Sequence, residues 1–495
     1  MSSLLQRLAL HPVGTDLGVL EETESDHGAG TYGAIGARSR SLAAQLRGVR
    51  TSLAGARVAF LAPPSRGYVD TLLGILLAGG TAVPLSPLHT SAELAHVLRV
   101  AQPEVLVSTS ALADKLEPVR EGLPVVVLDR PRKTVFAHDA EPNDAAPALM
   151  LFTSGTTGKP KGVVLSHGGV AATLAALEEA WQWKRTDRLL HVLPLHHTHG
   201  VVVALLGAFW AGAEVRFASF DPKTIFERLA HSTVMMMVPP MVAKLVEALE
   251  AAEPAQRASM TTALRSMRLF TCGSAALPAN LHARFAAATG HAILERYGMT
   301  EIGMALSNPY VGERAPGLVG TELPHVAIDL CDEAGKVLPH GEPGELRVRS
   351  PQMFTGYFGD SAATAAAFDA EGRFQTGDVG VRDERGYVRL LGRASSDILK
   401  SGGYKISALE IEEVLRAHPD VGEVAVIGTP DETWGDIVTA CIVVRAGREA
   451  PTLEALKEFA ARELAPYKLP RALRVLSELP RNAMGKVQKQ ALRAP

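Results

Sequence analysis

Short apolar runs alternate with longer amphipathic segments from residue 58 to about residue 310. In the first half of this stretch the predicted strands are 58–61, 82–85, 105–107 and 125–128, and the predicted helices between them are 68–78 and 92–101. In the second half the predicted helices are 170–183, 201–210, 224–229 and 242–252, and the predicted strands are 189–193, 214–217 and 233–238. Such alternation indicates parallel sheets with helices on both faces. The pattern therefore predicts two stacked α/β lobes, over roughly 40–180 and 180–310.

The pattern changes near residue 315. Apolar stretches at 327–330, 345–349 and 387–391 are separated by Gly, Pro and Asp turns, which predicts a smaller, mostly antiparallel β subdomain. After residue 393 an α/β pattern returns, with expected elements at 408–417 and 453–463 (helices) and at 424–427 and 437–444 (strands). About 100 residues can form an independent small domain, so we place a domain boundary near 393–396.

Composition and charge are those of an ordinary globular protein. The 495 residues are 47% hydrophobic and 21% charged, with a formal net charge of −3, so nothing favours nucleic acid or an anionic membrane as a partner. Cys272, Cys331 and Cys441 are too far apart for a metal site or a disulfide framework. The N-terminus lacks a secretory pattern, and the longest apolar stretch, 201–213, is too short to span a bilayer. A cytoplasmic protein is the simplest interpretation, and Arg7 with the amphipathic segment 4–10 leaves a mitochondrial presequence as the alternative.

The segment 153–162, Thr-Ser-Gly-Thr-Thr-Gly-Lys-Pro-Lys-Gly, carries most of the candidate chemistry. It follows the apolar run 148–152, which predicts a buried strand, so the loop leaves the sheet at the carboxyl end, where α/β folds place ligands. Glycine N–H groups, hydroxyl groups and two lysines favour a polyphosphate ligand. The close spacing of Gly155 and Gly158 excludes a Walker A loop. A solvated Gly/Ser/Thr linker is the alternative.

Several further motifs do not indicate a function when each is considered alone. In the segment 295–301, Tyr297 is suited to stack on a base, Gly298 to permit close backbone approach, and Glu301 to help hold a divalent metal beside phosphates. The other segments of this kind are 273–276, 375–378, 392–393, 401–405 and 480–486. Each of them alone is also typical of a surface turn, a strand–helix connection or a charged tail.

Taken in their order along the chain, these motifs resemble those of the adenylate-forming superfamily. This superfamily contains acyl-CoA synthetases, firefly-type luciferases and peptide-synthetase adenylation domains. The resemblance implies a large N-terminal domain of two stacked α/β lobes plus a β subdomain (1–393), a hinge (394–396) and a small mobile α+β C-terminal domain (397–495). At the hinge the sequence departs from the usual pattern by one apparent extra residue, which leaves the pivot residue open.

The resemblance also implies the reaction. A carboxylate attacks the α-phosphate of ATP to give an acyl-adenylate and pyrophosphate, and the CoA thiol then displaces AMP. Both reactants of the first step are anions, so cations and oriented donors must offset their repulsion. The implied ATP-binding residues are Thr153, Ser154, Gly155, Thr156, Thr157, Gly158, Lys159, Lys161, Gly273, Ser274, Ala275, Tyr297, Gly298, Met299, Thr300, Asp378 and Arg393.

More specific roles follow from the same resemblance. Glu301 and Thr153 hold Mg²⁺, and Lys486 bridges the substrate carboxylate and the reacting phosphate. Asp378 and Arg393 bind the ribose hydroxyls. The residues implied to line the CoA tunnel in a second domain orientation are Gly402, Gly403 and Tyr404.

The segment 194–200, Pro-Leu-His-His-Thr-His-Gly, matches the substrate-pocket segment of the superfamily. By that match His197 lies beside the reacting carboxylate and His199 faces the acyl pocket. Three histidines in four residues also suggest a metal site, but no Cys or paired carboxylate completes a ligand set. The lack of an acidic residue in this segment argues against an amino-acid substrate.

Arg296 gives the sharpest indication of the substrate. By the same resemblance it borders the acyl pocket, together with Ser274, and a buried guanidinium requires an anion. Arginine can grip a carboxylate with two N–H groups, which favours a dicarboxylic acid. The alternative is a structural ion pair of Arg296 with Glu295 or another acid.

Three sequence segments together resemble those of the malonyl-CoA synthetases of this superfamily: 180–183, 194–200 and 295–301. Malonate is therefore the leading substrate and methylmalonate a second one. We expect Met236 and Met237 to be core packing rather than specificity elements. Two alternatives stay open, an acyl-CoA synthetase for a short monocarboxylic acid and a catalytically idle binding or carrier-loading partner.

Overall fold

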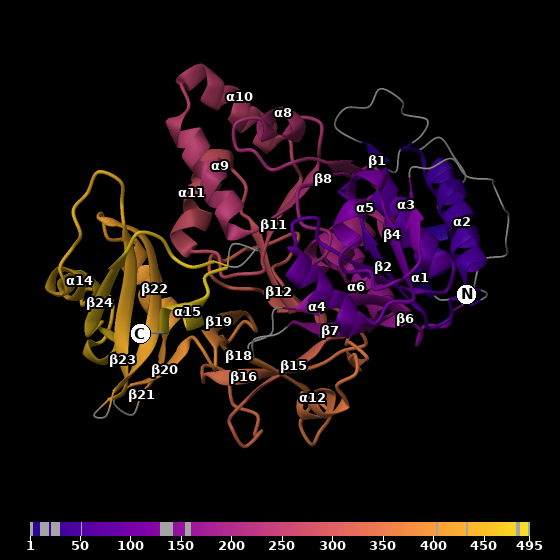
Figure 1. Cartoon of the computed structure of the whole chain (residues 1–495). Helices are drawn as coiled ribbons and strands as arrows, with labels where there is room; N and C mark the ends of the chain where they lie inside the picture. The colour runs from indigo at the N-terminus through magenta and orange to yellow at the C-terminus, as the bar shows by residue number, and fades with distance from the viewer. Residues whose placement is uncertain are drawn as a thin grey trace.

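The computed structural model describes residues 3–9, 19–20, 30–50, 52–128, 142–153, 160–401, 404–431, 434–481 and 486–493. The described residues form four β-sheets with helices around them. The C-terminal sheet stands apart from the two large lobes and lies beside β19 (Val388–Arg393) (Figure 1).

The first lobe contains a seven-stranded sheet in the order β17-β7-β6-β3-β2-β4-β5. Its strands are β2 (Arg57–Leu61), β3 (Thr81–Pro84), β4 (Val105–Ser108), β5 (Val125–Val127), β6 (Pro147–Thr153), β7 (Lys161–Ser166) and β17 (Gly356–Tyr357). Its helices are α2 (Tyr32–Val49), α3 (Arg66–Leu77), α4 (Ser91–Ala101) and α5 (Ser110–Leu116). The pairs among β2 to β6 are parallel, as predicted. The strand β7 was not predicted and runs antiparallel to β6, so the glycine-rich segment joins two antiparallel strands.

The second lobe contains an eight-stranded sheet in the order β1-β9-β8-β10-β11-β12-β13-β14. Its strands are β1 (Val19–Leu20), β8 (Arg188–His191), β9 (Glu214–Phe217), β10 (Val234–Met237), β11 (Leu269–Cys272), β12 (Leu294–Met299), β13 (Gly303–Ser307) and β14 (Thr321–Glu322). The helices that precede or join these strands are α1 (Ser3–Ala9), α6 (His167–Trp181), α8 (Ile225–Leu229), α9 (Pro239–Ala251), α10 (Pro254–Arg265) and α11 (Ala279–Thr289).

The helix predicted at 201–210 is only partly correct. The chain first forms a π-helix, η2 (His199–Leu206), and continues as the short helix α7 (Gly207–Ala211). The His191 imidazole bonds the Gly200 carbonyl at 2.9 Å within the first turn of η2. Wide turns of this kind are frequent at functional sites, and this one begins at a predicted pocket residue, His199.

The two remaining sheets follow in chain order. The third is antiparallel, as predicted, and consists of β15 (Ala327–Cys331), β16 (Gly344–Arg349), β18 (Phe374–Arg382) and β19, with α12 (Ser361–Ala366) nearby. The fourth contains β20 (Ile398–Ser401), β21 (Tyr404–Ser407), β22 (Val421–Asp431), β23 (Gly435–Val444) and β24 (Ala472–Leu476). Its helices are α13 (Ala408–Arg416), α14 (Leu453–Ala460), the 3₁₀ turn η3 (Pro466–Lys468) and α15 (Lys489–Arg493).

The cores agree with this division. One hydrophobic cluster joins the two lobes and includes Phe60, Trp181 and Phe209, whereas the C-terminal sheet has a cluster of its own. Met236 and Met237 are buried in the lobe cores, as expected. The cysteines Cys272, Cys331 and Cys441 are free and buried. Among the described helices, none has the length and apolar character needed to cross a membrane. The predicted fold class is confirmed, while the hinge at 394–396 stays a prediction.

Candidate active site

The predicted nucleotide residues lie on neighbouring strand ends. Gly273–Ala275 follow β11, and Tyr297–Met299 end the adjacent strand β12. The Tyr297 hydroxyl donates to Asp378 Oδ2 at 2.6 Å, and Arg393 Nε lies 2.9 Å from Asp378 Oδ1. The two predicted ribose-binding side chains, Asp378 on β18 and Arg393 on β19, therefore meet the predicted base-stacking tyrosine at one point.

Lys486 lies close enough to this point to act on it electrostatically. Burial raises the pKa of the Asp378 carboxyl group, and the positive charges of Arg393 and Lys486 oppose that rise. Lys486 is exposed and belongs to the terminal segment of the C-terminal domain. The positive charge of Lys486 therefore acts on the carboxyl group that is predicted to bind the ribose.

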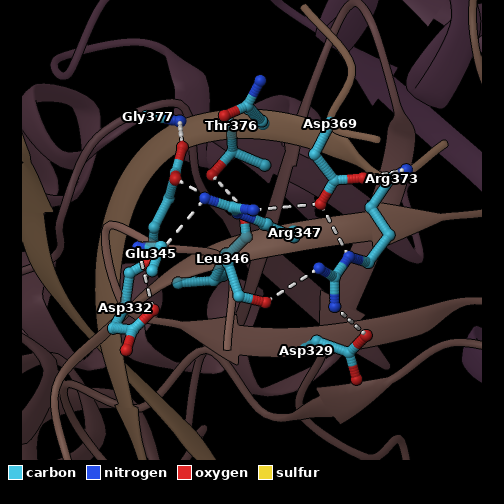
Figure 2. Close-up of polar contacts among 12 residues, drawn as sticks. Asp329, Asp332, Glu345, Leu346, Arg347, Asp369, Arg373, Thr376 and Gly377 are labelled. Atoms are coloured by element: carbon cyan, nitrogen blue, oxygen red, sulfur yellow. Dashed lines mark hydrogen bonds and ion pairs between the residues drawn. The ribbon is translucent and has the colours of Figure 1, made fainter. Parts of the chain in front are cut away.

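The turn that carries Asp378 is held by hydrogen bonds to residues of β16 that were not predicted as site residues. Figure 2 shows the Glu345 carboxylate, which accepts the Gly377 N–H at 3.0 Å, beside Arg347. Gly377 has φ +69°, a left-handed conformation that favours glycine. Thr376 Oγ1 donates to the Leu346 carbonyl at 2.7 Å. The buried strand β16 therefore sets the position of the Thr-Gly-Asp turn.

A buried ionic network supports Glu345 in turn. Arg347 contacts Glu345 at 3.4 Å and Asp369 at 3.0 Å, and Arg373 contacts Asp369 at 2.7 Å (Figure 2). Hydrogen bonds and ion pairs of Asp369 with both arginines outweigh its burial and lower its pKa to about 2. The network joins β16 to the turn that precedes β18.

The phosphate end of the site is partly described. Ser154, Gly155, Thr156, Thr157, Gly158 and Lys159 lie outside the described residues. Thr153 ends β6 and pairs with Lys161, the first residue of β7. Lys161 Nζ lies 3.6 Å from Asp360 Oδ2 and 4.9 Å from the centre of the Tyr357 ring. The Tyr357 hydroxyl also donates to Glu301 Oε1 at 3.1 Å. Tyr357, which sequence reasoning missed, thus connects the second lysine of the loop with the predicted metal ligand.

The residues at this end fit a magnesium ion. Mg²⁺ in nucleotide sites is held by one or two carboxylates together with phosphate oxygens and water. Glu301 is buried, burial raises its pKa, and Tyr357 donates to only one of its two oxygens. A bound cation would favour the ionised form of Glu301, and Glu301 and Thr153 supply oxygen donors of the kind that Mg²⁺ takes.

Arg296, which is predicted to border the acyl pocket, is almost fully buried. Its Nε and Nη2 atoms have no hydrogen-bond partner among the described residues. The guanidinium lies against the backbone of Gly273, where an added Cβ would come within 2.4 Å of Nη1. Burial lowers the pKa of Arg296 to about 10, so the group remains charged at neutral pH.

Among the described residues, Arg296 forms no ion pair with Glu295 or with another acid. Arg296 and Glu295 are neighbours on β12 and point to opposite faces of the sheet. Glu295 accepts the Gly317 N–H at 3.0 Å, and burial raises the pKa of Glu295 to about 8. Its carboxyl group is therefore mostly protonated at neutral pH and offers Arg296 no negative charge.

The three histidines of the segment 194–200 all have pKa values below the ordinary value, and His197 and His199 are the two that were predicted as site residues. His199 Nδ1 lies 3.2 Å from Ser274 Oγ, and its Nε2 has no partner among the described residues. Burial, followed by the charge of Arg296, lowers the pKa of His199 well below its ordinary value. The rings of His196 and His197 lie 4.0 Å apart, and that of His89, which was not predicted, lies 5.4 Å from His196. Burial lowers the pKa of His196 to about 3 and that of His197 to about 4.

The remaining predicted residues are only partly placed. Thr300 follows β12 and shares a 2.8 Å hydrogen bond with Thr198 of the pocket segment. Gly402 and Gly403 lie outside the described residues. Tyr404 is exposed and stacks on Tyr467, with ring centres 4.3 Å apart. The assignment of this region to CoA binding stays a prediction.

Comparison of the chain with known protein families identifies the class to which this fold and site belong. The chain matches the family "AMP-binding enzyme" over residues 19–358 and the family "AMP-binding enzyme C-terminal domain" over residues 410–486. The chain belongs to the AMP-binding enzyme family.

Individual relatives are more specific. The chain is 39% identical to the human mitochondrial malonate–CoA ligase ACSF3, over 94% of this chain and 88% of that protein. Among solved structures, ATP-bound MatB from Rhodopseudomonas palustris is 35% identical with a TM-score of 0.90, covering 99% of this chain and 97% of MatB. A malonyl-CoA ligase in a ternary product complex with methylmalonyl-CoA and AMP is 38% identical with a TM-score of 0.71, covering 97% of this chain and all of that one. The fold therefore superposes better on the ATP-bound structure, although the product complex is closer in sequence.

Proposed function

We propose that the protein ligates malonate to CoA in an ATP-dependent reaction that passes through malonyl-adenylate and releases AMP and pyrophosphate, with methylmalonate as a second substrate. The observation that carries the choice of acid is the buried Arg296, whose Nε and Nη2 lack partners among the described residues. The malonate–CoA ligases among the relatives support the same choice.

The energetics of Arg296 favour a dicarboxylic acid. A buried, unpaired guanidinium costs several kcal/mol, and the second carboxylate of malonate offsets that cost only when the substrate is bound. A monocarboxylic acid such as butyrate leaves the cation unpaired and places a methyl group against it. His199 and Ser274, which lie beside each other, complete a polar rim around the same carboxylate.

The ATP half of the site would act as follows. Thr153, the loop 154–159 and Lys161 grip the phosphates, while Asp378 and Arg393 bind the ribose. Bound Mg²⁺ would neutralise phosphate charge, held by Glu301 and Thr153. His197 lies beside the carboxylate that is activated.

Lys486 would stabilise the negative charge that develops when the carboxylate attacks the α-phosphate. Its electrostatic influence on Asp378 and the close superposition on an ATP-bound relative both support a domain arrangement suited to adenylation. For thioester formation the C-terminal domain would turn about 394–396 and bring Gly402, Gly403 and Tyr404 to the CoA thiol.

We also propose a cytoplasmic location. Three buried, free cysteines suit a reducing compartment. Because the human relative is named as mitochondrial, fractionation of cells that express the full chain is the appropriate test.

A screen of acids tests the proposed activity directly. CoA-dependent AMP release should be measured with acetate, propionate, butyrate, malonate, methylmalonate and succinate, and malonate should give the highest kcat/KM. A preference for butyrate or propionate would instead support the monocarboxylic alternative. Absence of AMP release with any acid would support a binding role.

A further inference from the structure

The terminal segment that carries Lys486 is anchored by a buried cation three residues further on. Lys489 Nζ lies 2.6 Å from Asp397 Oδ1 and 2.6 Å from Glu412 Oε1. None of these three side chains exposes more than 12% of its surface. Ion pairs this deeply buried are costly unless both partners are present, so the three groups hold one another in a fixed arrangement.

Asp397 connects this anchor to the nucleotide site. Its Oδ1 faces Lys489, while its Oδ2 accepts the backbone N–H of Arg393 at 2.9 Å. The Arg393 side chain in turn contacts Asp378 at 2.9 Å. An unbroken series of contacts therefore runs from α15 across the predicted hinge to the proposed ribose-binding carboxylate.

Further contacts fix both ends of the anchor. Arg493, at the end of α15, donates to the Ser396 carbonyl at 3.2 Å, and Glu412 accepts the Val426 N–H of β22 at 2.7 Å. In Figure 1, α15 lies on the side of the C-terminal sheet that faces β19. The terminal segment is thus tied to the C-terminal sheet and to the hinge at the same time.

We propose that Lys489 is a positioning residue for the first half-reaction, because it holds the terminal segment, and with it Lys486, at the reacting phosphate. This inference rests on the proposed function. An exposed lysine loses rotamer entropy when it is fixed. A buried anchor three residues away reduces the backbone freedom that would be lost in addition. A displacement of about 1 Å can lower a rate about 10²-fold.

The test separates the two half-reactions in the full-length protein. Lys489→Met keeps the length of the side chain but removes its charge. We expect acid-dependent ATP–pyrophosphate exchange to fall by about 10²-fold in kcat with KM for ATP nearly unchanged, since Lys489 touches no substrate. Thioester formation from preformed acyl-adenylate should stay within about twofold, and Lys489→Arg should restore most of the exchange.

Lys468→Met provides the matched control. Lys468 Nζ lies 2.6 Å from Glu410 in the same domain, and this ion pair includes no residue of the predicted hinge 394–396. Both half-reactions should proceed unchanged in this variant. If Lys489→Met does not fold, Asp397→Asn keeps the shape of the partner and should show the same loss confined to adenylation.

The outcomes are distinguishable from failure of the proposed function. Equal loss in both half-reactions, or no loss in either, overturns the role of Lys489. If the wild type prefers a different acid, the proposed substrate is wrong, and the comparison is made with the preferred acid. A wild type that activates no acid contradicts both proposals.

Discussion

At the scale of single residues, the position of the Arg296 side chain depends on Gly273. The guanidinium can lie where it does only because residue 273 has no side chain, since a Cβ there would meet Nη1 at 2.4 Å. The pocket therefore depends on a pair of residues from neighbouring strands. Sequence reasoning selected both residues but assigned them to different ligands, because the distance between them along the chain hides their contact.

Gly273→Ala should accordingly act on the acid more than on ATP. The added methyl group displaces the guanidinium, so we expect KM for malonate to rise by about tenfold or more, with a loss of about 1.5–3 kcal/mol in transition-state binding. Steady-state kinetics with malonate and ATP varied separately measure both constants. Gly48→Ala is the control, because a Cβ at Gly48 contacts nothing within 4 Å. An unchanged KM for malonate would place Arg296 outside the acid pocket.

The burial of the histidines in the segment 194–200 predicts how the free energy of unfolding depends on pH. The unfolded chain binds protons at histidine below pH about 6.5, whereas burial keeps His196 neutral until its pKa of about 3. The free energy of unfolding therefore falls as the pH falls from about 6.5 toward 3. We expect His196→Gln to reduce the loss between pH 7 and pH 5 by about 1–2 kcal/mol, measured by urea unfolding.

The exposed His340 offers a control for this experiment. His340→Gln should leave the pH dependence of unfolding as it is in the wild type. A slope that is the same in all three proteins would contradict a neutral, buried His196.

At the scale of elements, the position of Asp378 depends on β16. Glu345→Ala removes the acceptor for the Gly377 N–H and leaves Arg347 with one fewer carboxylate, so the turn should loosen. We expect KM for ATP to rise by about tenfold, and Glu345→Gln, which keeps the acceptor, to recover most of it. ATP titration of pyrophosphate exchange measures this effect.

Glu371→Ala is the control, because it removes a carboxylate from the same ionic network without touching the turn that carries Asp378. Glu371 contacts Arg373 at 3.3 Å but leaves 62% of its side chain exposed, so its loss should change neither KM nor stability appreciably. A Glu345→Gln variant as impaired as Glu345→Ala would argue that charge rather than turn geometry matters.

The elements themselves were largely predictable, and the exceptions have physical causes. Alternating apolar runs at 58–61 and 105–107 predicted parallel strands because burial on both faces demands such runs. The strand β7 was missed because it begins with the polar Lys161 and leads straight into α6. The two-residue strand β17 pairs with β7 from almost 200 residues away, so no local pattern reveals this strand or the contact of Tyr357 with Glu301.

At the scale of the whole molecule, the proposed adenylation step requires residues from both domains. Motif order identified Lys486, Asp378 and Arg393 as one site, and the structure brings Lys486 within electrostatic reach of Asp378. The contact of Asp397 with Lys489 was not predictable, because both residues look like solvated charges in the sequence. Only the folded hinge shows that they are buried together.

Lys486→Ala should separate the two half-reactions completely. Malonate-dependent pyrophosphate exchange should fall by about 10²–10³-fold, the cost of one preorganised charge at the transition state. CoA should still react with preformed malonyl-adenylate at a rate near that of the wild type. Lys457→Ala, on the exposed side of α14, should affect neither step. Equal loss of both steps would contradict the role of Lys486.

The central claim is that a fixed cation in the acid pocket pairs with the far carboxylate of the substrate. The most direct measurement is the ratio of kcat/KM for malonate to kcat/KM for butyrate, in the wild type and in Arg296→Ala. We expect a wild-type ratio well above one. In the variant, transition-state binding should fall by about 2–4 kcal/mol with malonate alone, so that the ratio falls by about 30-fold or more. A ratio that Arg296→Ala leaves unchanged would contradict the claim.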